Sequence, residues 1–444
     1  MFLLSASYYF YGSWHTWYLL LIIGSTLVDY FAALSIHKST VQKHRKRWLL
    51  LSLIVNLGVL FIFKYFNFFI DAVSEWFSLI GLHIQDYQLE LILPIGISFY
   101  TFQTISYTID VYKGKIEPER NLGFFALYVS FFPQLVAGPI ERASRLQPQL
   151  HKKTEINLTD VQRGLNLIAY GFFKKLVVAD RLASYVSRVY ADTSQMESVP
   201  LLLGAIFFCI QVYCDFSGYS DIAIGSAKLF GIDLMQNFDR PYLASNLREF
   251  WRRWHISLSE WIRDYVYIPL GGSRKGGKRT IINLFITFIL VGLWHGGYWS
   301  LVVWGAAHAA GVAIERLFIG VKLKVPQSVI TPFTRLWTLS FVTLTFIVYV
   351  ARDLSQSVIA IQRIFDFDLW HFSINNALAG LSVSQFQLCL LAIFLLGLSY
   401  LLPKDGLFKG KWSNLQNTGY FLLFTILTFL FSTNDQIEFF YFQF

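Results

Sequence analysis

Residues 281–314 read IINLFITFILVGLWHGGYWSLVVWGAAHAAGVAI, two apolar runs joined by a short glycine-rich turn. The first run ends beside His295, and neither run contains Asp, Glu, Lys or Arg. Lipid-embedded segments must satisfy their backbone hydrogen bonds internally, which helices do. This stretch therefore predicts two membrane-embedded helices that flank a histidine.

The composition of the whole chain agrees with this interpretation. Of 444 residues, 55% are apolar and only 15% are charged, whereas soluble domains carry about 25% charged residues. These values exclude a soluble enzyme, a disordered chain and a nucleic-acid-binding protein, and predict an all-α polytopic membrane protein. The net charge of +9 is concentrated in short loops, which indicates cytoplasmic loops rather than a nucleic-acid partner.

Apolar segments recur along the chain and predict about nine to eleven membrane elements, at about 20 residues per crossing. We place them at 17–36, 49–70, 91–112, 122–139, 201–230, 281–293, 300–314, 336–350, 388–402 and 420–431. A basic loop at 37–47 is expected on the cytoplasmic side, and the polar stretch 71–90 on the opposite side. No linker divides the chain, so we expect one membrane domain over residues 1–444.

Three local features refine these elements. Pro94 and Gly96 predict a bent entry into the segment 91–112. The segment 122–139 ends in a proline- and glycine-rich stretch, which predicts a re-entrant element. Residues 159–162 (TDVQ) fit a capping box that opens a helix.

The region 239–280 is dense in Arg, Trp and Tyr, and we expect it on the cytoplasmic side as a helix followed by a loop. Residues 247–265 (LREFWRRWHISLSEWIRDY) predict one amphipathic helix in the bilayer interface or at a funnel mouth. Its apolar face would hold Phe250, Trp251, Trp254, Leu258, Trp261 and Tyr265. Glu249 and Arg253 are four residues apart and could pair. His255 lies at the border of the two faces, so a packed histidine and a functional one are equally compatible with the spacing.

His295 is the strongest functional candidate. An ionisable side chain at membrane depth is costly and indicates function by default, and histidine exchanges protons near neutral pH. Gly292, Gly296 and Gly297 allow a backbone or ligand to approach closely. The alternative is a histidine hydrogen-bonded between helices. His308, among small residues, is better explained by helix packing.

Asp215 and Asp221 are acids inside an apolar segment, and a structural ion pair with a nearby arginine is the favoured explanation over a polar pocket. The stretch 272–279 (GSRKGGKR) departs from a phosphate-binding loop because Arg279 stands where Ser or Thr is required. A basic cytoplasmic loop is the better interpretation. Cys209, Cys214 and Cys389 lack metal-ligand spacing, and no metal site is predicted.

Several motifs in order resemble the membrane-bound O-acyltransferase family. The similarity is to its bacterial branch, which contains the alginate O-acetylation membrane component and the teichoic acid D-alanyl transfer protein. The matching stretches are 93–102, 131–139, 171–175, 179–181, 214–221, 251–259, 263–272, 292–296 and the C-terminal 441–444. Family members usually begin with a further apolar segment before the part that matches residues 5–14, so a shortened N-terminal helix is expected.

The resemblance implies a ring of tilted transmembrane and re-entrant helices around a central tunnel. It implies that His295 is catalytic and that His255 is the supporting histidine. The expected donor is acetyl-CoA or another acyl thioester, with no permanently bound cofactor. In this hypothesis His295 acts as a general base, and His255, Asn283 or Trp294 steadies the oxyanion. Candidate tunnel or donor-side residues are Asp215, Trp251, Arg253, Trp254, Asn283 and Trp294.

The same resemblance implies O-acetylation of an exported polysaccharide at the bacterial inner membrane. The expected partners are the lipid bilayer, an exported acetyltransferase of the SGNH type and a polysaccharide synthesis and export complex. A transporter without acyl-transfer chemistry is the main alternative, in which Lys64, Asp215, Asp221 and His295 form an ion path. A structural scaffold for a synthesis complex is a third interpretation.

Overall fold

The computed structural model describes residues 1–82, 87–153, 155–317, 326–351, 353–371, 373–402, 413–433, 437 and 439, and this part of the chain contains helices and no strands. The C-terminal motif at 441–444 lies outside the described residues. Contacts divide the chain into two compact units, one made of residues 1–164 and 223–235, the other of residues 165–222 and the chain from 236 onward. Because their ranges interleave, the expected single domain stays a prediction.

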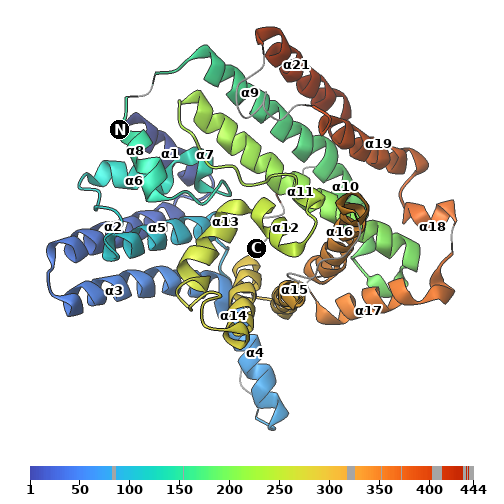
Figure 1. Ribbon diagram of the computed structural model, residues 1–444, viewed down its shortest axis with the longest axis horizontal. Coiled ribbons are helices and arrows are strands. Elements are labelled where there is room, and N and C mark those ends of the chain that lie inside the picture. Colours follow the sequence, from blue (N-terminus) through green and yellow to red (C-terminus); the bar gives the residue numbers. More distant parts are fainter. Residues whose placement is uncertain are drawn as a thin grey trace. The chain divides into compact units, whose positions relative to one another are not determined.

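The first unit is built on eight helices. They are α1 (Phe2–Gly12), α2 (Tyr18–Lys38), α3 (Gln42–Leu60), α4 (Phe66–Leu79), α5 (Ile97–Tyr112), α6 (Leu122–Ser130), α7 (Phe132–Leu135) and α8 (Ala143–His151). Helices α2, α3 and α5 lie side by side (Figure 1). Buried hydrogen bonds join them: the Asp29 carboxylate accepts from the Ser52 hydroxyl at 2.5 Å and from the Asn56 amide at 2.9 Å. Such bonds are a common means of joining helices in lipid.

The loop predicted at 37–47 is mostly helical, which corrects that expectation. Helix α2 continues to Lys38 and α3 begins at Gln42, because Lys and Arg are good helix formers and helices extend past the hydrocarbon boundary. Helix α3 then runs through a π-helical turn at Phe61–Tyr65 into α4, so the helix covers the start of the stretch 71–90. Within this turn, Lys64 faces α5 and donates to the Ser98 hydroxyl at 3.2 Å.

Two predicted interruptions are confirmed in this unit. Gly96 has a φ of 78° and precedes the first residue of α5, so the chain bends into this helix as expected. The segment 122–139 is broken at Phe131 between α6 and α7. A Cβ on Gly138 would lie 2.4 Å from the Cα of Gln134, so only glycine allows the turn that follows α7.

The predicted capping box is wrong in its position. Helix α9 (Leu158–Phe172) begins one residue before Thr159. The Asn157 side-chain oxygen accepts a hydrogen bond from the Asp160 backbone amide at 2.8 Å, which is the role of an N-cap residue. The helix-opening signal was correctly recognised, but a different side chain caps the helix.

Helices α9 and α11 (Ser198–Leu229) run through both units. The remaining helices of the second unit are α10 (Asp180–Val189), α12 (Leu247–Arg253), α13 (Ile256–Ile262), α14 (Gly277–His295), α15 (Trp299–Leu317), α16 (Gln327–Ala351), α17 (Leu354–Phe365), α18 (Ile374–Leu378), α19 (Val383–Ser399) and α21 (Asn414–Phe431).

Five helical segments are long and apolar enough to cross a membrane. They are Tyr18–Lys38, Gln42–Leu79, Ser198–Leu229, Gly277–His295 and Ser328–Ala351. These helices confirm an all-α, multi-pass membrane protein. The larger number of membrane elements stays a prediction.

Candidate active site

His295 is the last residue of α14, which forms an antiparallel hairpin with α15. The two helices touch backbone to backbone: a Cβ on Gly292 would lie 2.1 Å from the Leu301 carbonyl oxygen, and one on Gly305 would lie 2.3 Å from the Phe288 carbonyl oxygen. This close approach holds the end of α14 against the first turns of α15. His295 itself is only 3% exposed.

Aromatic rings and one hydrogen bond fix the His295 imidazole. Its Nδ1 lies 3.1 Å from the Tyr349 hydroxyl on α16. The Trp294, Trp304 and Tyr349 rings contact it edge to face, with centroid distances of 5.0, 5.4 and 5.4 Å. A base oriented by a hydrogen-bonded neighbour is a common arrangement in acyl transfer.

His255 lies at a break that the sequence did not predict. Residues 247–265 form two short helices, α12 and α13, followed by a π-helical turn at Arg263–Tyr267. The break falls at Trp254 and His255, and His255 has a φ of 42°. The expectation of one amphipathic interfacial helix is therefore wrong.

The aromatic residues of this region point into the protein rather than to a membrane interface. Phe250, Trp251, Trp254, Leu258 and Trp261 are all less than 9% exposed. Burial against neighbouring helices, not lipid contact, explains their helical spacing. The predicted pair between Glu249 and Arg253 is confirmed at 2.5 Å.

Asn237 sets the protonation state of His255. The Asn237 side-chain oxygen accepts from the Ser257 amide at 3.2 Å and hydroxyl at 3.0 Å, while its nitrogen donates to Ser220 at 3.3 Å. The same oxygen lies 3.2 Å from His255 Nδ1, so this nitrogen carries the proton and Nε2 is an acceptor. Burial lowers the pKa of His255 to about 3. A neutral imidazole of this tautomer cannot donate from Nε2, which argues against its expected role as oxyanion donor.

Trp294 brings the two histidines together. Its ring centroid lies 5.5 Å from that of His255 and 5.0 Å from that of His295. All three side chains are buried. Residues forty positions apart in the sequence thus share one aromatic neighbour, as expected for a common site.

His308 has both ring nitrogens engaged. The Trp251 indole donates to Nδ1 at 3.3 Å, and the Thr345 hydroxyl lies 3.1 Å from Nε2. Since an indole N–H can only donate, Nε2 carries the proton and donates to Thr345. This arrangement fits the packing role expected for His308.

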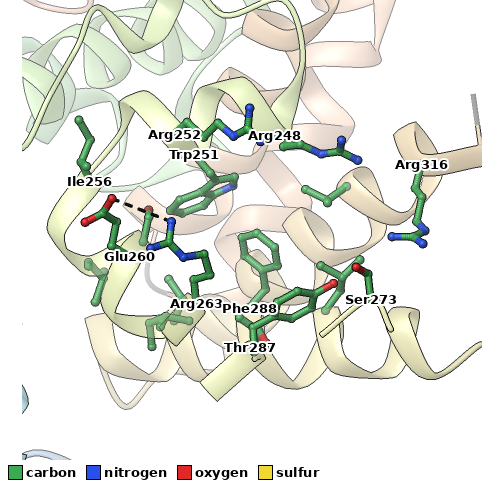
Figure 2. Close-up of a pocket in the computed structure, with 17 residues that line it drawn as sticks. Arg248, Trp251, Arg252, Ile256, Glu260, Arg263, Ser273, Thr287, Phe288 and Arg316 are labelled. Carbon is green, nitrogen blue, oxygen red and sulfur yellow. Dashed lines mark ion pairs between the residues drawn. The ribbon is translucent and has the colours of Figure 1, made fainter. Parts of the chain in front are cut away.

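A cavity of about 780 Å³ lies between α12–α13 and the α14–α15 hairpin (Figure 2). Arg248, Arg252, Arg263 and Arg316 line it together with Trp251, Phe288 and aliphatic side chains. Arg263 pairs with Glu260 at 3.9 Å. The side chains of the other three arginines make no hydrogen bond or ion pair with any residue that the structure describes, although the Glu315 carboxylate lies near Arg248.

The cavity leads along α14 toward His295. Thr287 and Val291 line it, and they lie eight and four residues before His295, on the same helical face. At 1.5 Å per residue, the Val291 backbone is about 6 Å from that of His295 along the helix axis. The cavity therefore ends one helical turn before the candidate base.

The buried acids Asp215 and Asp221 form ion pairs, but their partners are lysines and not arginines. Both lysines lie in a π-helical turn at Phe173–Ala179. Lys175 Nζ contacts Asp215 at 2.7 Å, and Lys174 Nζ contacts Asp221 at 2.6 Å. Lys175 also pairs with Asp180 at 2.8 Å. This network explains why acids are tolerated in an apolar segment.

Other predicted donor-side residues lie in different surroundings. Trp251 lines the cavity, whereas Arg253, Trp254, Asp215, Asn283 and Trp294 do not. The Asn283 amide donates to the Gly272 carbonyl at 2.9 Å. It lies twelve residues before His295, about 18 Å along α14, so it is too distant to steady an oxyanion there.

Sequence reasoning missed Asn237, Trp304 and Tyr349. Asn237 is distant from His255 in the sequence, and Tyr349 stands in an apolar run where nothing distinguishes it. A polar or aromatic residue able to hydrogen-bond within such a run was the only available signal. Within the described ranges, no group of three or more His, Cys, Asp or Glu side chains could hold a metal ion.

Known proteins are similar over most of the chain. Residues 3–351 match the family described as MBOAT, membrane-bound O-acyltransferase. The probable alginate O-acetylase AlgI of Pseudomonas aeruginosa is 40% identical over 89% of this chain and 76% of its own length. The peptidoglycan O-acetyltransferase of Helicobacter pylori is 35% identical over 81% and 72%. The teichoic acid D-alanyltransferase of Bacillus subtilis is 28% identical over 51% and 60%. The chain belongs to the membrane-bound O-acyltransferase family and is a multi-pass membrane O-acyltransferase.

Proposed function

We propose that this protein transfers an acetyl group from a cytoplasmic acyl thioester to a hydroxyl group on the far side of the bacterial inner membrane. The reaction serves O-acetylation of an exported polysaccharide, with His295 as the general base. The observation that carries the proposal is the arginine-lined cavity that ends one helical turn before His295.

The chemistry of the cavity suits an anionic thioester such as acetyl-CoA. Arginines recognise phosphate groups through several donors at once. The apolar wall from Trp251 to Phe288 offers a surface for an uncharged arm. The volume falls within the usual range for small-molecule sites, about 300–1,000 Å³. The donor acts as a substrate, so no permanently bound cofactor is required.

The length of α14 supports transfer across the membrane. Nineteen residues from Gly277 to His295 span about 28 Å, close to the hydrocarbon thickness of about 30 Å. The basic residues before and at the start of α14 favour the cytoplasmic side. A thioester that enters beside them and extends along α14 would present its acyl group to His295 near the opposite side.

In the proposed reaction the acceptor oxygen attacks the thioester carbonyl carbon while the neutral His295 imidazole takes the hydroxyl proton. A carbon–oxygen bond forms, and the carbonyl electron pair moves onto oxygen. When this tetrahedral intermediate collapses, the carbon–sulfur bond breaks and the imidazolium returns its proton to the thiolate. The products are an ester and a thiol. Tyr349 holds the imidazole through Nδ1, which leaves Nε2 for the acceptor.

The names of the relatives guide the choice of acceptor. One is named for alginate and another for peptidoglycan, so an exported polysaccharide is the proposed class. We propose that an exported acetyltransferase of the SGNH type completes the transfer, within a polysaccharide synthesis and export complex.

Replacing His295 by Ala tests the proposal. We expect loss of polysaccharide O-acetylation in a deletion strain that carries the variant, with normal amounts of the protein in the membrane. His44, an exposed residue near the start of α3, offers a matched control as His44→Ala. Near-normal O-acetylation in the His295→Ala strain would overturn the assignment.

A second measurement separates an enzyme from a transporter. Purified protein should release thiol from acetyl-CoA in the presence of an acceptor, and an exporter without chemistry would not. The pairing of Asp215 and Asp221 with lysines already gives both acids a structural explanation, which weakens the ion-path alternative.

A further inference from the structure

Trp304 is a buried tryptophan beside the candidate base. It lies on α15, is 1% exposed, and contacts the rings of His295 at 5.4 Å and His308 at 4.8 Å. Its indole Nε1 is buried and has no hydrogen-bond partner among the residues that the structure describes.

An unpartnered indole N–H is unusual in a protein interior. Buried tryptophans usually find an acceptor, and each exception calls for an explanation such as a catalytic role. Trp251, which contacts the Trp304 ring at 5.9 Å, follows the rule because it donates to His308 at 3.3 Å. Two neighbouring indoles therefore differ: one N–H is used by the fold, and the other remains available to a ligand.

The hairpin holds Trp304 rigidly at His295. Its chain neighbour Gly305 lies against the Phe288 carbonyl, and the Phe346 and Tyr349 rings of α16 pack on the indole at 6.4 and 5.3 Å. The indole meets the imidazole at 87°, edge to face. Edge-to-face contact places ring atoms at van der Waals distance, so an oxygen held at the imidazole would lie beside the indole.

We propose that Trp304 is a catalytic residue whose indole N–H stabilises the oxyanion of the tetrahedral intermediate, an inference that rests on the proposed acyl transfer. When the acceptor oxygen bonds to the thioester carbon, the carbonyl electron pair moves onto oxygen, and this oxygen accepts the Trp304 hydrogen bond. Collapse of the intermediate returns the electron pair to the carbonyl and expels the thiolate. Trp304 gains and loses no atoms.

The proposal also accounts for the neighbouring side chains. His255 is neutral and donates through Nδ1 to Asn237, and Asn283 lies about three turns away. Trp304 is a donor in contact with His295 whose hydrogen is not claimed by a described residue. A preorganised donor in a dry site needs no rearrangement as charge develops.

The test replaces only the N–H group. Trp304→3-benzothienylalanine, introduced by nonsense suppression, keeps the ring shape but puts sulfur in place of the indole nitrogen. With acetyl-CoA as the donor and an alginate oligosaccharide as the acceptor, we expect kcat to fall about 10²–10³-fold, as when an oxyanion donor is removed. KM for acetyl-CoA and the thermal unfolding midpoint should stay unchanged.

Two controls make the outcome specific. The same replacement at Trp337, which is 63% exposed on α16, should leave kcat unchanged. An acyl dithioester donor, whose sulfur is a weak acceptor, should slow the native protein more than the Trp304 variant, and a purely structural role would not produce this difference. A kcat within threefold of native for the Trp304 variant overturns the inference. Transfer that survives His295→Ala overturns the proposed function instead.

Discussion

Adding one methyl group to Gly292 should separate His295 from its partners on α15. A Cβ at this position would lie 2.1 Å from the Leu301 carbonyl oxygen, whereas ordinary contact begins at 3.4 Å. The difference, 3.4 − 2.1 Å, requires α15 to move by about 1.3 Å, and overpacking of this kind costs about 1–3 kcal/mol. Because a misplacement of about 1 Å in a catalytic site can cost about 10²-fold in rate, Gly292→Ala should lose most activity while it remains folded.

The assay compares acetyl transfer from acetyl-CoA and thermal unfolding in detergent for the native protein and the variant. Gly397→Ala is the matched control, because this glycine also lies in a helix and a methyl group added there would have no described atom within 4 Å. It should keep full activity and gain about 0.5–1 kcal/mol from the better helix former. Native activity and an unchanged unfolding midpoint for Gly292→Ala would refute the close helix contact and its catalytic consequence.

Three further predictions concern individual side chains. Lys175→Met leaves two buried carboxylates without their cation, so the free energy of unfolding should fall by about 3–5 kcal/mol, measured by thermal unfolding with the exposed Lys152→Met as control. Tyr349→Phe removes a hydrogen bond worth about 1–1.5 kcal/mol, so kcat should fall about tenfold with KM unchanged, and an unchanged kcat would exclude an orienting role toward His295. Burial lowers the pKa of His255 to about 3 from an ordinary 6.5, so the unfolded chain binds more protons between these values and stability falls as pH drops. From pH 7 to pH 5 the loss is about 2 kcal/mol, and His255→Gln should not show it; equal pH dependence in both proteins would contradict this account.

Some of the site could be predicted because its signals are local. An ionisable residue at the end of an apolar run is visible in one dimension, and this singled out His295. The pair between Glu249 and Arg253 follows from helical spacing alone. The bend at Gly96 likewise depends on a single residue without a Cβ.

The rest depends on contacts between distant parts of the chain. The break at His255 is stabilised by Asn237, whose oxygen binds both His255 and Ser257, and periodicity within residues 247–265 cannot reveal it. In the same way, the apolar context of Asp215 indicated a partner but not that the partner would be Lys175 from another helix. Local spacing predicts which residues share a face, whereas tertiary contacts decide where a helix stops.

The left-handed backbone at His255 sets folding and chemistry against each other at one position. A φ of 42° is uncommon for any residue with a side chain, although His and Asn tolerate it better than most. Glycine would relieve the strain at no steric cost, and it would also remove the imidazole. A population selected for folding alone would therefore drift toward glycine or asparagine at position 255, and this drift would uncouple stability from catalysis. Deep mutational scanning that scores membrane abundance and O-acetylation separately should show the two preferences diverging at this codon.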